Sequence, residues 1–197
     1  MIFNHYASTL SELDMQMIRC VPPGGNWKNI PESVPSQRLA QIRESYRAGK
    51  GSRSTYYGRL RPEMPAYTIN TYFTRPGNGC NMHYDQDRTL SQREAARFQS
   101  FPDSFEFIGS LGAINNQIGN AVPPLLAYQI AKNIPFTGQF VDLFCGAGGL
   151  ALGFVWAGWT PIIGNDIDHY AVKTHKRNLG GEVIAGDINH QEVHRVI

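Results

Sequence analysis

The 197-residue chain is 42% hydrophobic and 17% charged, and its 20 Gly and 12 Pro are scattered among apolar runs, which excludes intrinsic disorder. No apolar run approaches the roughly 18–20 residues of a membrane span, and residues 1–10 lack the basic and apolar regions of a secretory signal. Three widely spaced cysteines, Cys20, Cys80 and Cys145, fit neither a disulfide framework nor a CxxC metal site, so a soluble, cytoplasmic protein without a membrane partner is expected.

The charge is distributed unevenly, although its formal total is only +2. Residues 19–97 carry a local balance of +7, and residues 98–197 one of −3. Seven cations of the first segment have tyrosines interspersed and only Glu44 as an acidic neighbour: Arg38, Arg43, Arg47, Lys50, Arg53, Arg59 and Arg61. This pattern suits a nucleic-acid surface, since cations near a polyanion release counterions. Charge alone favours the plainer alternative of a solvated basic face.

The first part of the chain is expected to be mostly irregular. Residues 1–60 are dense in turn residues around VPPGGNWKNIP, with one short helix over 36–49 ending at Gly49. Residues 66–74, AYTINTYFT, alternate and are rich in Thr and aromatic residues, which predicts a strand. RPGNG, at 75–79, then forms a turn.

Two helices are predicted in the middle of the chain. The first begins at a capping box made by Ser91 and Glu94 and stops before Pro102. The second begins near Pro123, a residue suited to the first turn of a helix. Its expected apolar face consists of Val122, Leu125, Leu126 and Ile130.

From Phe140 the pattern becomes βαβαβ. The predicted strands are 140–145, 160–166 and 181–188, and the predicted helices run to Ala157 and over 168–178. Right-handed crossovers would make these strands a parallel sheet. We therefore expect an α/β fold.

Three aspartates lie at or near the ends of successive predicted strands. Asp142, Asp166 and Asp187 are separated by 24 and 21 residues, and the carboxyl ends of parallel strands are where open α/β sheets bind ligands. Glycines 146, 148 and 149 let a ligand approach the backbone before the helix N-terminus. Asp166, twenty residues after Gly146, is placed to accept from ribose hydroxyls. The constellation favours an adenosine-containing cofactor over a purely structural turn with helix-capping aspartates.

The cofactor is either a dinucleotide or S-adenosylmethionine. The dinucleotide fingerprint Gly-x-Gly-x-x-Gly lacks its third glycine, because Ala151 stands there. A dinucleotide fold would also need a second βαβ half before Ile197. S-adenosylmethionine brings a small zwitterion to the glycine loop instead of a pyrophosphate.

Five segments resemble the conserved motifs of DNA (cytosine-5)-methyltransferases. FVDLFCGAGGLALGF resembles motif I, GNDID motif II, GDI motif III, RTLSQREAARFQSFPDSF motif IX and QIGNAVPP motif X. PPGGNWKNIPE and GRLRPEMPAYTINTYFTRPGNG resemble the later part of a target-recognition region. The resemblance implies a partial Rossmann-like S-adenosylmethionine-dependent methyltransferase sheet, with part of a small target-recognition domain. It implies no metal.

The resemblance also implies a role for individual residues. For S-adenosyl-L-methionine, the adenine would be contacted by Phe144, Asp187 and Ile188, and the ribose by Asp166 with Ile167 beside it. The methionine portion would be surrounded by Gly146, Ala147, Gly148 and Gly149, and its tail would be covered by Asn120 and Val122. For DNA they are Thr68 and Ile69 near the flipped base, with Arg88 at the backbone. Ile167 stands where the family often has an aromatic residue, which would loosen stacking on the cofactor.

The motif order differs from the usual one, because IX and X precede I. This predicts a circular permutation joined at residues 133–139. Three regions follow: 1–87 as a partial target-recognition, DNA-binding region, 88–135 as the motif IX and X helices connecting the domains, and 136–197 as the N-terminal half of the S-adenosylmethionine-binding catalytic domain.

No catalytic residue is assigned in this chain. The family's nucleophile comes from a Pro-Cys pair and its acid from Glu-Asn-Val, and neither occurs here. We therefore expect one subunit of a split, heterodimeric enzyme of a prokaryotic restriction-modification system. Its partners would be a second subunit carrying motifs IV to VIII and double-stranded DNA with a flipped cytosine.

Three other functions remain open. The chain would be a non-catalytic half or truncated methyltransferase that binds DNA and cofactor, a dinucleotide-dependent oxidoreductase, or a DNA-binding module whose glycine turn is structural. None of these needs a complementing catalytic chain.

Overall fold

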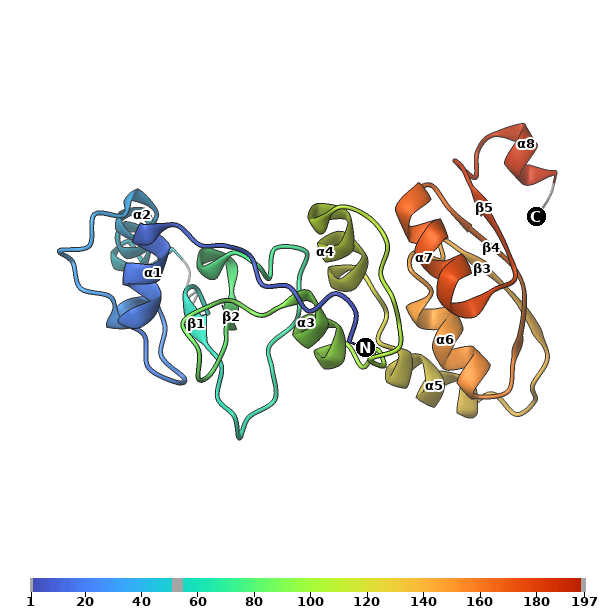
Figure 1. Cartoon of the computed structure of the whole chain (residues 1–197), viewed down its shortest axis with the longest axis horizontal. Coiled ribbons are helices and arrows are strands. Elements are labelled where there is room, and N and C mark those ends of the chain that lie inside the picture. Colours follow the sequence, from blue (N-terminus) through green and yellow to red (C-terminus); the bar gives the residue numbers. More distant parts are fainter. Residues whose placement is uncertain (1, 51–54, 196–197) are drawn as a thin grey trace. The chain divides into compact units, whose positions relative to one another are not determined.

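The computed structural model describes residues 2–50 and 55–195 (Figure 1). The chain consists of two compact units. The N-terminal unit is residues 6–91, and the C-terminal unit combines residues 1–5 with 92–197. Among the described residues, no helix is long and apolar enough to cross a membrane.

The C-terminal unit contains a parallel three-stranded sheet in the order β3-β4-β5. Its strands are β3 (Gln139–Leu143), β4 (Thr160–Asp166) and β5 (Glu182–Ala185). Helices α6 (Gly149–Trp156) and α7 (His169–Leu179) connect them, which confirms the predicted βαβαβ order. The fold is therefore mixed α/β, consistent with a partial Rossmann-like methyltransferase sheet. A short helix, α8 (Gln191–His194), follows β5.

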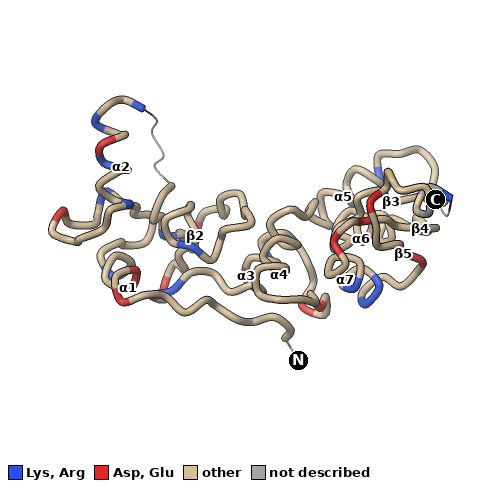
Figure 2. Tube along the Cα trace, turned by 90° about the horizontal axis from the view of Figure 1, so that it is seen from above, with Lys and Arg blue, Asp and Glu red and all other residues tan. Residues whose placement is uncertain are grey.

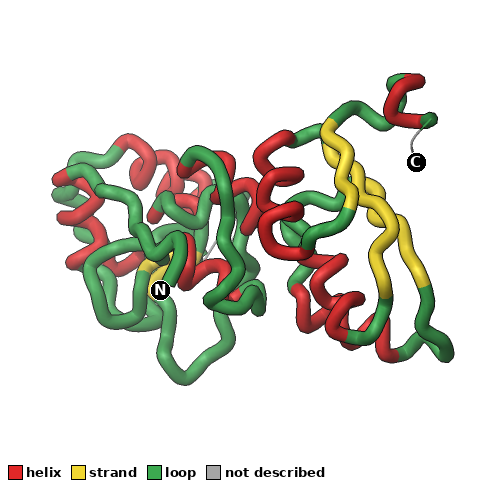
Figure 3. The backbone as a smooth tube through the Cα atoms, turned by 45° about the vertical axis from the view of Figure 1, so that its right-hand side comes forward, coloured by secondary structure: helices red, strands yellow, loops and turns green. Residues whose placement is uncertain are grey.

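The two faces of this sheet are covered differently. Figure 3 shows α6 and α7 on one face, while the opposite face is open along β3. Asp142 is buried, whereas Val141 and Leu143 are each 42% exposed, since alternate residues of a strand point to opposite faces. On the covered face, Cys145, Val172 and Val183 form a small core.

Three helices precede the sheet in this unit: α3 (Gln92–Phe98), α4 (Leu111–Gly119) and α5 (Pro124–Lys132). Helix α5 packs against α6 so closely that a Cβ at Gly153 would clash with the Pro124 carbonyl oxygen. Small residues make this contact, since Ala127 and Ala131 are buried. The predicted apolar face of α5 is not part of the core, because Val122, Leu125, Leu126 and Ile130 are all exposed.

A buried arginine organises the segment around α3. The Arg93 side chain is fully buried and donates to the carbonyl oxygens of Phe3, Pro102 and Phe105. Arg97, by contrast, forms a two-pronged surface pair with Asp103, both N···O distances being 2.7 Å. Both arginines have intramolecular partners and therefore structural roles.

The N-terminal unit has helices α1 (Glu12–Arg19) and α2 (Gln37–Arg47), a short parallel pair of strands, β1 (Gly58–Arg59) and β2 (Cys80–Met82), and 3₁₀ turns η1 (Trp27–Asn29) and η2 (Pro76–Asn78). Its core includes Met17, Ile18, Leu39 and Met82. Helix α2 begins after Ser36, which caps it by accepting from the Leu39 N–H, and the helix predicted over 36–49 is confirmed.

The strand predicted over residues 66–74 is wrong. Asn70 accepts from the Tyr72 N–H through its side chain, and its carbonyl oxygen accepts from the Phe73 N–H. These local bonds bend the chain into turns, so the alternating pattern has no neighbouring strand to pair with.

Arg59 lies in the core of the N-terminal unit, not on its basic surface. Only 5% of it is exposed, and its guanidinium donates to the carbonyl oxygens of Ile18, Val21, His83 and Gln86. An ion pair with Asp87 at 2.7 Å completes the set. One cation of the predicted nucleic-acid surface is thus a structural tie between α1, β1 and the 83–87 loop.

Candidate cofactor site

A cavity of 260 Å³ lies at the carboxyl ends of β3 and β4, beside the start of α6 and the turn after α4. All of its lining belongs to the C-terminal unit. It brings together seven of the residues predicted to bind a cofactor: Asn120, Val122, Phe144, Gly146, Ala147, Gly149 and Asp166. The cavity therefore joins the motif X turn to the glycine loop.

The glycine loop follows a backbone path that few side chains tolerate. Gly146 and Gly148 have φ of +53° and +96°, in the left-handed region that glycine occupies without strain. A Cβ at Gly148 would lie 2.6 Å from Leu179 Cδ1 and 2.8 Å from His175 Cδ2, and one at Gly149 would clash with the Val122 carbonyl oxygen. Glycines thus bring α7 and the motif X turn against the loop from either side.

Phe144 also lies in the left-handed region, with φ of +60°. The residue is 73% exposed although it lines the cavity. A large apolar ring held open at the mouth of a cavity is suited to stacking on a planar ligand.

Asp166 is fixed by the backbone on both of its carboxylate oxygens. Oδ2 accepts from the Gly146 N–H at 2.8 Å, and Oδ1 accepts from the Asp168 N–H at 2.8 Å. Each carboxylate oxygen accepts about two hydrogen bonds. Asp166 can therefore hold the loop and still accept from the hydroxyls of a ribose.

Asp142 is the feature of the cavity that was not among the predicted binding residues. It is only 5% exposed, and its Oδ2 has no hydrogen-bond partner among the described residues. Burial, helped by the negative charge of Asp166, raises the pKa of Asp142 to about 6. A buried carboxylate without a partner favours a cationic ligand group beside it. The sequence signal for it was its place as the first of the three spaced aspartates.

Gln117 is a second lining residue that the sequence did not single out. It is 5% exposed, and its Nε2 donates to the Ile108 carbonyl oxygen while its Oε1 has no partner among the described residues. Gln117 is the first residue of the QIGNAVPP segment, but the resemblance assigned roles only to Asn120 and Val122 of that segment.

Four predicted cofactor residues do not line this cavity: Gly148, Ile167, Asp187 and Ile188. Ile167 is 71% exposed at the end of β4. Asp187, beyond β5, accepts from the backbone and side chain of Asn189, and these bonds lower the pKa of its carboxyl. Because β5 lies beside β4, Asp187 shares the carboxyl edge of the sheet with the cavity.

Neither of the two buried cysteines, Cys80 and Cys145, has the environment of an activated nucleophile. Burial raises the pKa of Cys145 to about 12, with Asp142 and Asp166 adding to the shift, and burial raises the pKa of Cys80 to about 11. Both thiols are therefore protonated at neutral pH. Cys20 donates weakly to the Gln16 carbonyl oxygen at 3.3 Å.

The predicted DNA contacts all lie in the N-terminal unit, and their exposure differs. Thr68 is exposed, but Ile69 is only 5% exposed and packs inward. Arg88 donates to Gln86 Oε1 at 2.6 Å and to the Thr89 carbonyl oxygen at 3.0 Å. Of the Thr68–Ile69 pair, only the threonine presents its side chain to solvent.

Residues 7–135 and 138–196 match the family of C-5 cytosine-specific DNA methylases. Over 135 residues the chain is 39% identical to the type II methylase M.HgiDII of Herpetosiphon aurantiacus, covering 66% of this chain and 36% of that protein. It is 37% identical over 124 residues to the type II methyltransferase M.Sau96I of Staphylococcus aureus, covering 63% and 28%. To the DNA (cytosine-5-)-methyltransferase M.ApeKI of Aeropyrum pernix it is 51% identical over 81 residues, covering 40% and 17%.

The matched stretches thus span about a third or less of these relatives' own length. The methyl donor of this family is S-adenosylmethionine. The cavity fits that donor, because it offers a glycine cradle, a fixed ribose acceptor in Asp166 and the orphaned carboxylate of Asp142 for a positive group. The family match covers most of the chain's length, and the segments that resemble motifs X, I and II line one cavity. The chain therefore belongs to the C-5 cytosine-specific DNA methylases.

Proposed function

We propose that this chain is one subunit of a DNA (cytosine-5)-methyltransferase of a restriction-modification system. In this proposal the C-terminal unit binds S-adenosylmethionine, and the N-terminal unit supplies part of the DNA recognition. A second polypeptide, carrying motifs IV to VIII, contributes the Pro-Cys nucleophile and the Glu-Asn-Val acid. The observation that carries the proposal is a cofactor cradle without an activated thiol.

The cradle supports the binding half of the proposal. S-adenosylmethionine, when bound, supplies a methyl group on a positively charged sulfur. Asp142, buried and unpaired, would face the positive part of the ligand, and Asp166 would accept from the ribose hydroxyls. Asn120 and Val122 would cover the methionine tail from the motif X turn, whose Val122 carbonyl oxygen already abuts Gly149. The exposed Phe144 ring would stack on the adenine.

The protonated state of the buried thiols supports the proposal that a second polypeptide supplies the nucleophile. Attack on C6 of cytosine needs a thiolate, and Cys80 and Cys145 are held protonated by burial. The open sheet edge gives independent support, since β3 pairs only with β4 in the described part of the chain and exposes Val141 and Leu143 on its uncovered face. Parallel sheets are normally covered on both faces. A further strand and helix from the second polypeptide would cover this surface.

The packing of α5 supports the circular permutation. Motif X leads into α5, and α5 rests directly on the motif I helix α6 through Gly153. Only residues 133–138 separate the end of α5 from the start of β3. A short joint suffices for elements that already lie side by side.

The test of cofactor binding uses calorimetric titration of the full chain with S-adenosylmethionine. We expect Asp166→Asn to weaken binding of S-adenosylmethionine at least tenfold, because the amide nitrogen cannot accept a hydrogen bond from a ribose hydroxyl. The matched control is Asp103→Asn, an exposed carboxylate of the same unit that pairs with Arg97 and should leave binding unchanged. Titration with NAD should give no binding. A chain that binds NAD and ignores S-adenosylmethionine would overturn the proposal.

A further inference from the structure

The seven cations that the sequence grouped as a basic surface have different environments in the structure. Arg59 is buried, Arg43 donates to the Ile30 carbonyl oxygen at 2.6 Å, and Arg47 pairs with Glu32 at 2.8 Å. Arg53 lies outside the described residues. The remaining three, Arg38, Lys50 and Arg61, have no acidic partner within the described part of the chain. Figure 2 shows basic positions along α2 and near β2.

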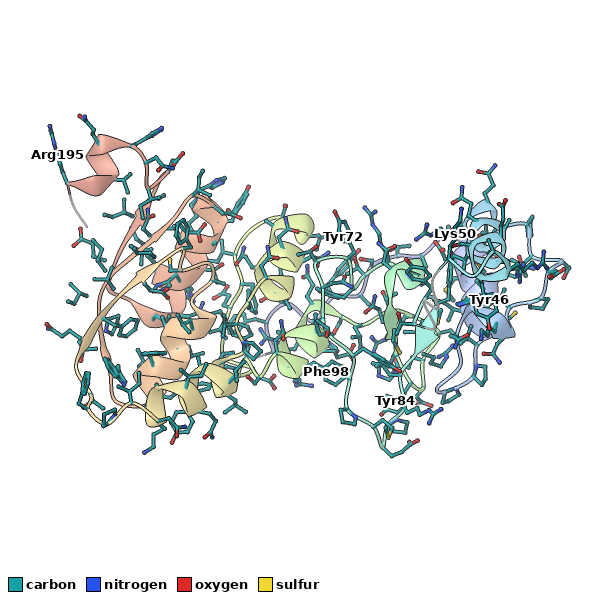
Figure 4. All side chains as sticks on the ribbon, turned by 180° about the vertical axis from the view of Figure 1, so that it is seen from behind. Tyr46, Lys50, Tyr72, Tyr84, Phe98 and Arg195 are labelled. Atoms are coloured by element: carbon teal, nitrogen blue, oxygen red, sulfur yellow. The ribbon has the colours of Figure 1, made fainter. Side chains whose placement is uncertain are left out.

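These three cations lie at two different cavities of the N-terminal unit. Arg38 and Lys50 line one of 320 Å³ on the side of α2, where Arg38 lies over the Tyr56 ring at 5.1 Å. Figure 4 labels Lys50 and Tyr46 at this end of the unit. Arg61 lines a second cavity of 470 Å³, which α2 does not reach. The two cavities therefore offer separate contacts.

Arg61 lies against a glycine turn. A Cβ at Gly24 would clash with Arg61 Nε and lie 2.8 Å from Arg61 Cζ, so the guanidinium rests directly on the glycine backbone. Gly24 has φ of +74°. The turn is itself anchored, since the Gly24 N–H donates to the Arg59 carbonyl oxygen and the Arg59 N–H donates to the Gly25 carbonyl oxygen, both at 3.1 Å. The Arg61 side chain is exposed and lies against this turn, and its N–H groups have no acidic partner among the described residues.

The lining of the larger cavity leaves Arg61 as its one charged side chain with unused donors. Arg59 is committed to carbonyl groups and Asp87. Asn26 is engaged in the local turn, because its Oδ1 accepts from the Lys28 N–H and its backbone N–H donates to Asn29 Oδ1. Tyr67 and Met64 are 58% and 57% exposed and form apolar walls. No acidic residue lines this cavity among the described residues.

We infer that Arg61 is a specificity-determining residue that hydrogen-bonds the major-groove edge of a guanine in the recognised DNA. Arginine forms paired bonds to guanine O6 and N7, which is the commonest specific contact in protein–DNA complexes. The exposed guanidinium lies beside a cavity that has no acidic lining residue among those described, so its N–H groups are available to a base edge. Arg38 and Lys50, at the other cavity, contact phosphates and carry no sequence information. This inference rests on the proposed DNA-recognition role of the N-terminal unit.

The experiment selects bound molecules from a randomised pool of duplex DNA with the full chain and sequences them. Wild type enriches a guanine at one or more positions. Arg61→Gln loses that preference by about 5- to 100-fold at one position and leaves the others intact. Arg61→Lys behaves in the same way, because an ammonium keeps the charge but lacks the paired N–H donors of the planar guanidinium.

The matched control is Arg38→Gln. It weakens binding to all sequences alike, lowers the slope of log affinity against log salt by about 1 and keeps the sequence preference. Thermal unfolding of each variant checks that the exposed substitutions leave the fold intact.

Each contrary result has a distinct meaning. An unchanged guanine preference in Arg61→Gln overturns the inference, and so does a wild-type chain that binds DNA without any preference. A wild-type chain that does not bind duplex DNA overturns the DNA-recognition role itself. Uniform weakening by Arg61→Gln, like that of Arg38→Gln, would make Arg61 a phosphate contact and also overturn the inference.

Discussion

At the scale of one residue, the buried carboxylate of Asp142 lowers the stability of the folded chain when it is ionised. Its pKa in the folded chain is about 6 because it is buried beside Asp166, whereas an exposed aspartate titrates near its ordinary value of 3.8. Folding therefore favours the protonated form. The stability contribution of this proton is complete below about pH 4 and is lost as the pH rises through 6.

Replacing Asp142 by Asn should stabilise the chain at pH 8. We expect the free energy of unfolding to rise by about 3 kcal/mol at pH 8 and to change little at pH 4, since the pKa lies about two units above its ordinary value and one unit corresponds to about 1.4 kcal/mol. Urea unfolding of both proteins at the two pH values measures this. Equal gains at both pH values would show that ionisation of Asp142 is not the cause.

The same carboxylate should make cofactor binding depend on pH. Affinity for the cationic S-adenosylmethionine is expected to fall by up to tenfold for each pH unit below about 6, as Asp142 becomes protonated. Calorimetric titration between pH 8 and pH 5 provides the curve, with Asp142→Asn expected to give weaker and nearly flat binding. A wild-type curve as flat as that of the variant would remove Asp142 from the site.

Arg59 should be the most sensitive cation of the N-terminal unit. Arg59→Met is expected to lower the free energy of unfolding by about 3 kcal/mol or more, because it leaves four buried carbonyl groups and Asp87 without their donor. Arg47→Met is the comparison, since an exposed pair such as Arg47–Glu32 contributes at most about 1 kcal/mol. Similar losses from both, measured by chemical denaturation, would contradict the assignment.

The roles of the arginines were beyond the reach of sequence reasoning. The charge pattern grouped Arg59 with Arg38 and Arg61, because all three stand in one basic segment. Arg59 is structural because carbonyl groups from two segments distant in sequence, around Ile18 and around His83, converge on it. Such convergence exists only after folding.

At the scale of elements, the α5–α6 contact links two motifs that lie about thirty residues apart in the chain. Gly153→Ala should lower the free energy of unfolding of the C-terminal unit by about 2 kcal/mol or more, because its Cβ would clash with Pro124 and Ala127. Gly112→Ala is the control. Gly112 lies in α4 with open space around its Cα, and alanine there should be neutral or stabilise by up to about 1 kcal/mol.

Thermal unfolding of the two glycine variants measures the difference. A Gly153→Ala chain as stable as wild type would mean that α5 does not rest on α6 as described. Loss of stability in both variants would instead indicate a general intolerance of added methyl groups.

The elements that sequence reasoning predicted best are those whose signals are local. The βαβαβ order follows from compact apolar runs, a glycine turn and Asp168, which caps α7. Helices α1 and α4 begin at the capping serines Ser11 and Ser110 and went unrecognised among turn-rich neighbours. Strands β1 and β2 have two and three residues, too few for any periodicity. The 66–74 segment has strand composition but bends at Asn70.

The candidate site, like the elements, was predictable where its signals are local in sequence. The glycine loop and Asp166 follow from spacing, and the resemblance added Asn120 and Val122 from a distant segment. Spacing placed Asp142 at a strand end but did not reveal that its carboxylate is buried without a partner among the described residues, and it gave no role to Gln117. Whether Asp187 lines the cavity depends on where β5 ends, and residue spacing alone does not give that end.

At the scale of the whole molecule, the described residues hold the candidate cofactor cavity and the N-terminal unit, together with a sheet of three strands. Strand β3 has an unpaired edge within the described part, and Val141, Leu143 and Phe144 are exposed around it. An open apolar edge of this kind favours pairing with another strand. The proposed second polypeptide would satisfy this edge and bring the missing nucleophile to the mouth of the cavity.

The most direct test of this account measures methyl transfer from labelled S-adenosylmethionine to duplex DNA by the purified chain. We predict that the chain binds the cofactor yet incorporates no methyl group, and that incorporation at cytosine C5 begins when a polypeptide carrying motifs IV to VIII is added. Substantial incorporation at cytosine C5 by the chain alone would contradict the account.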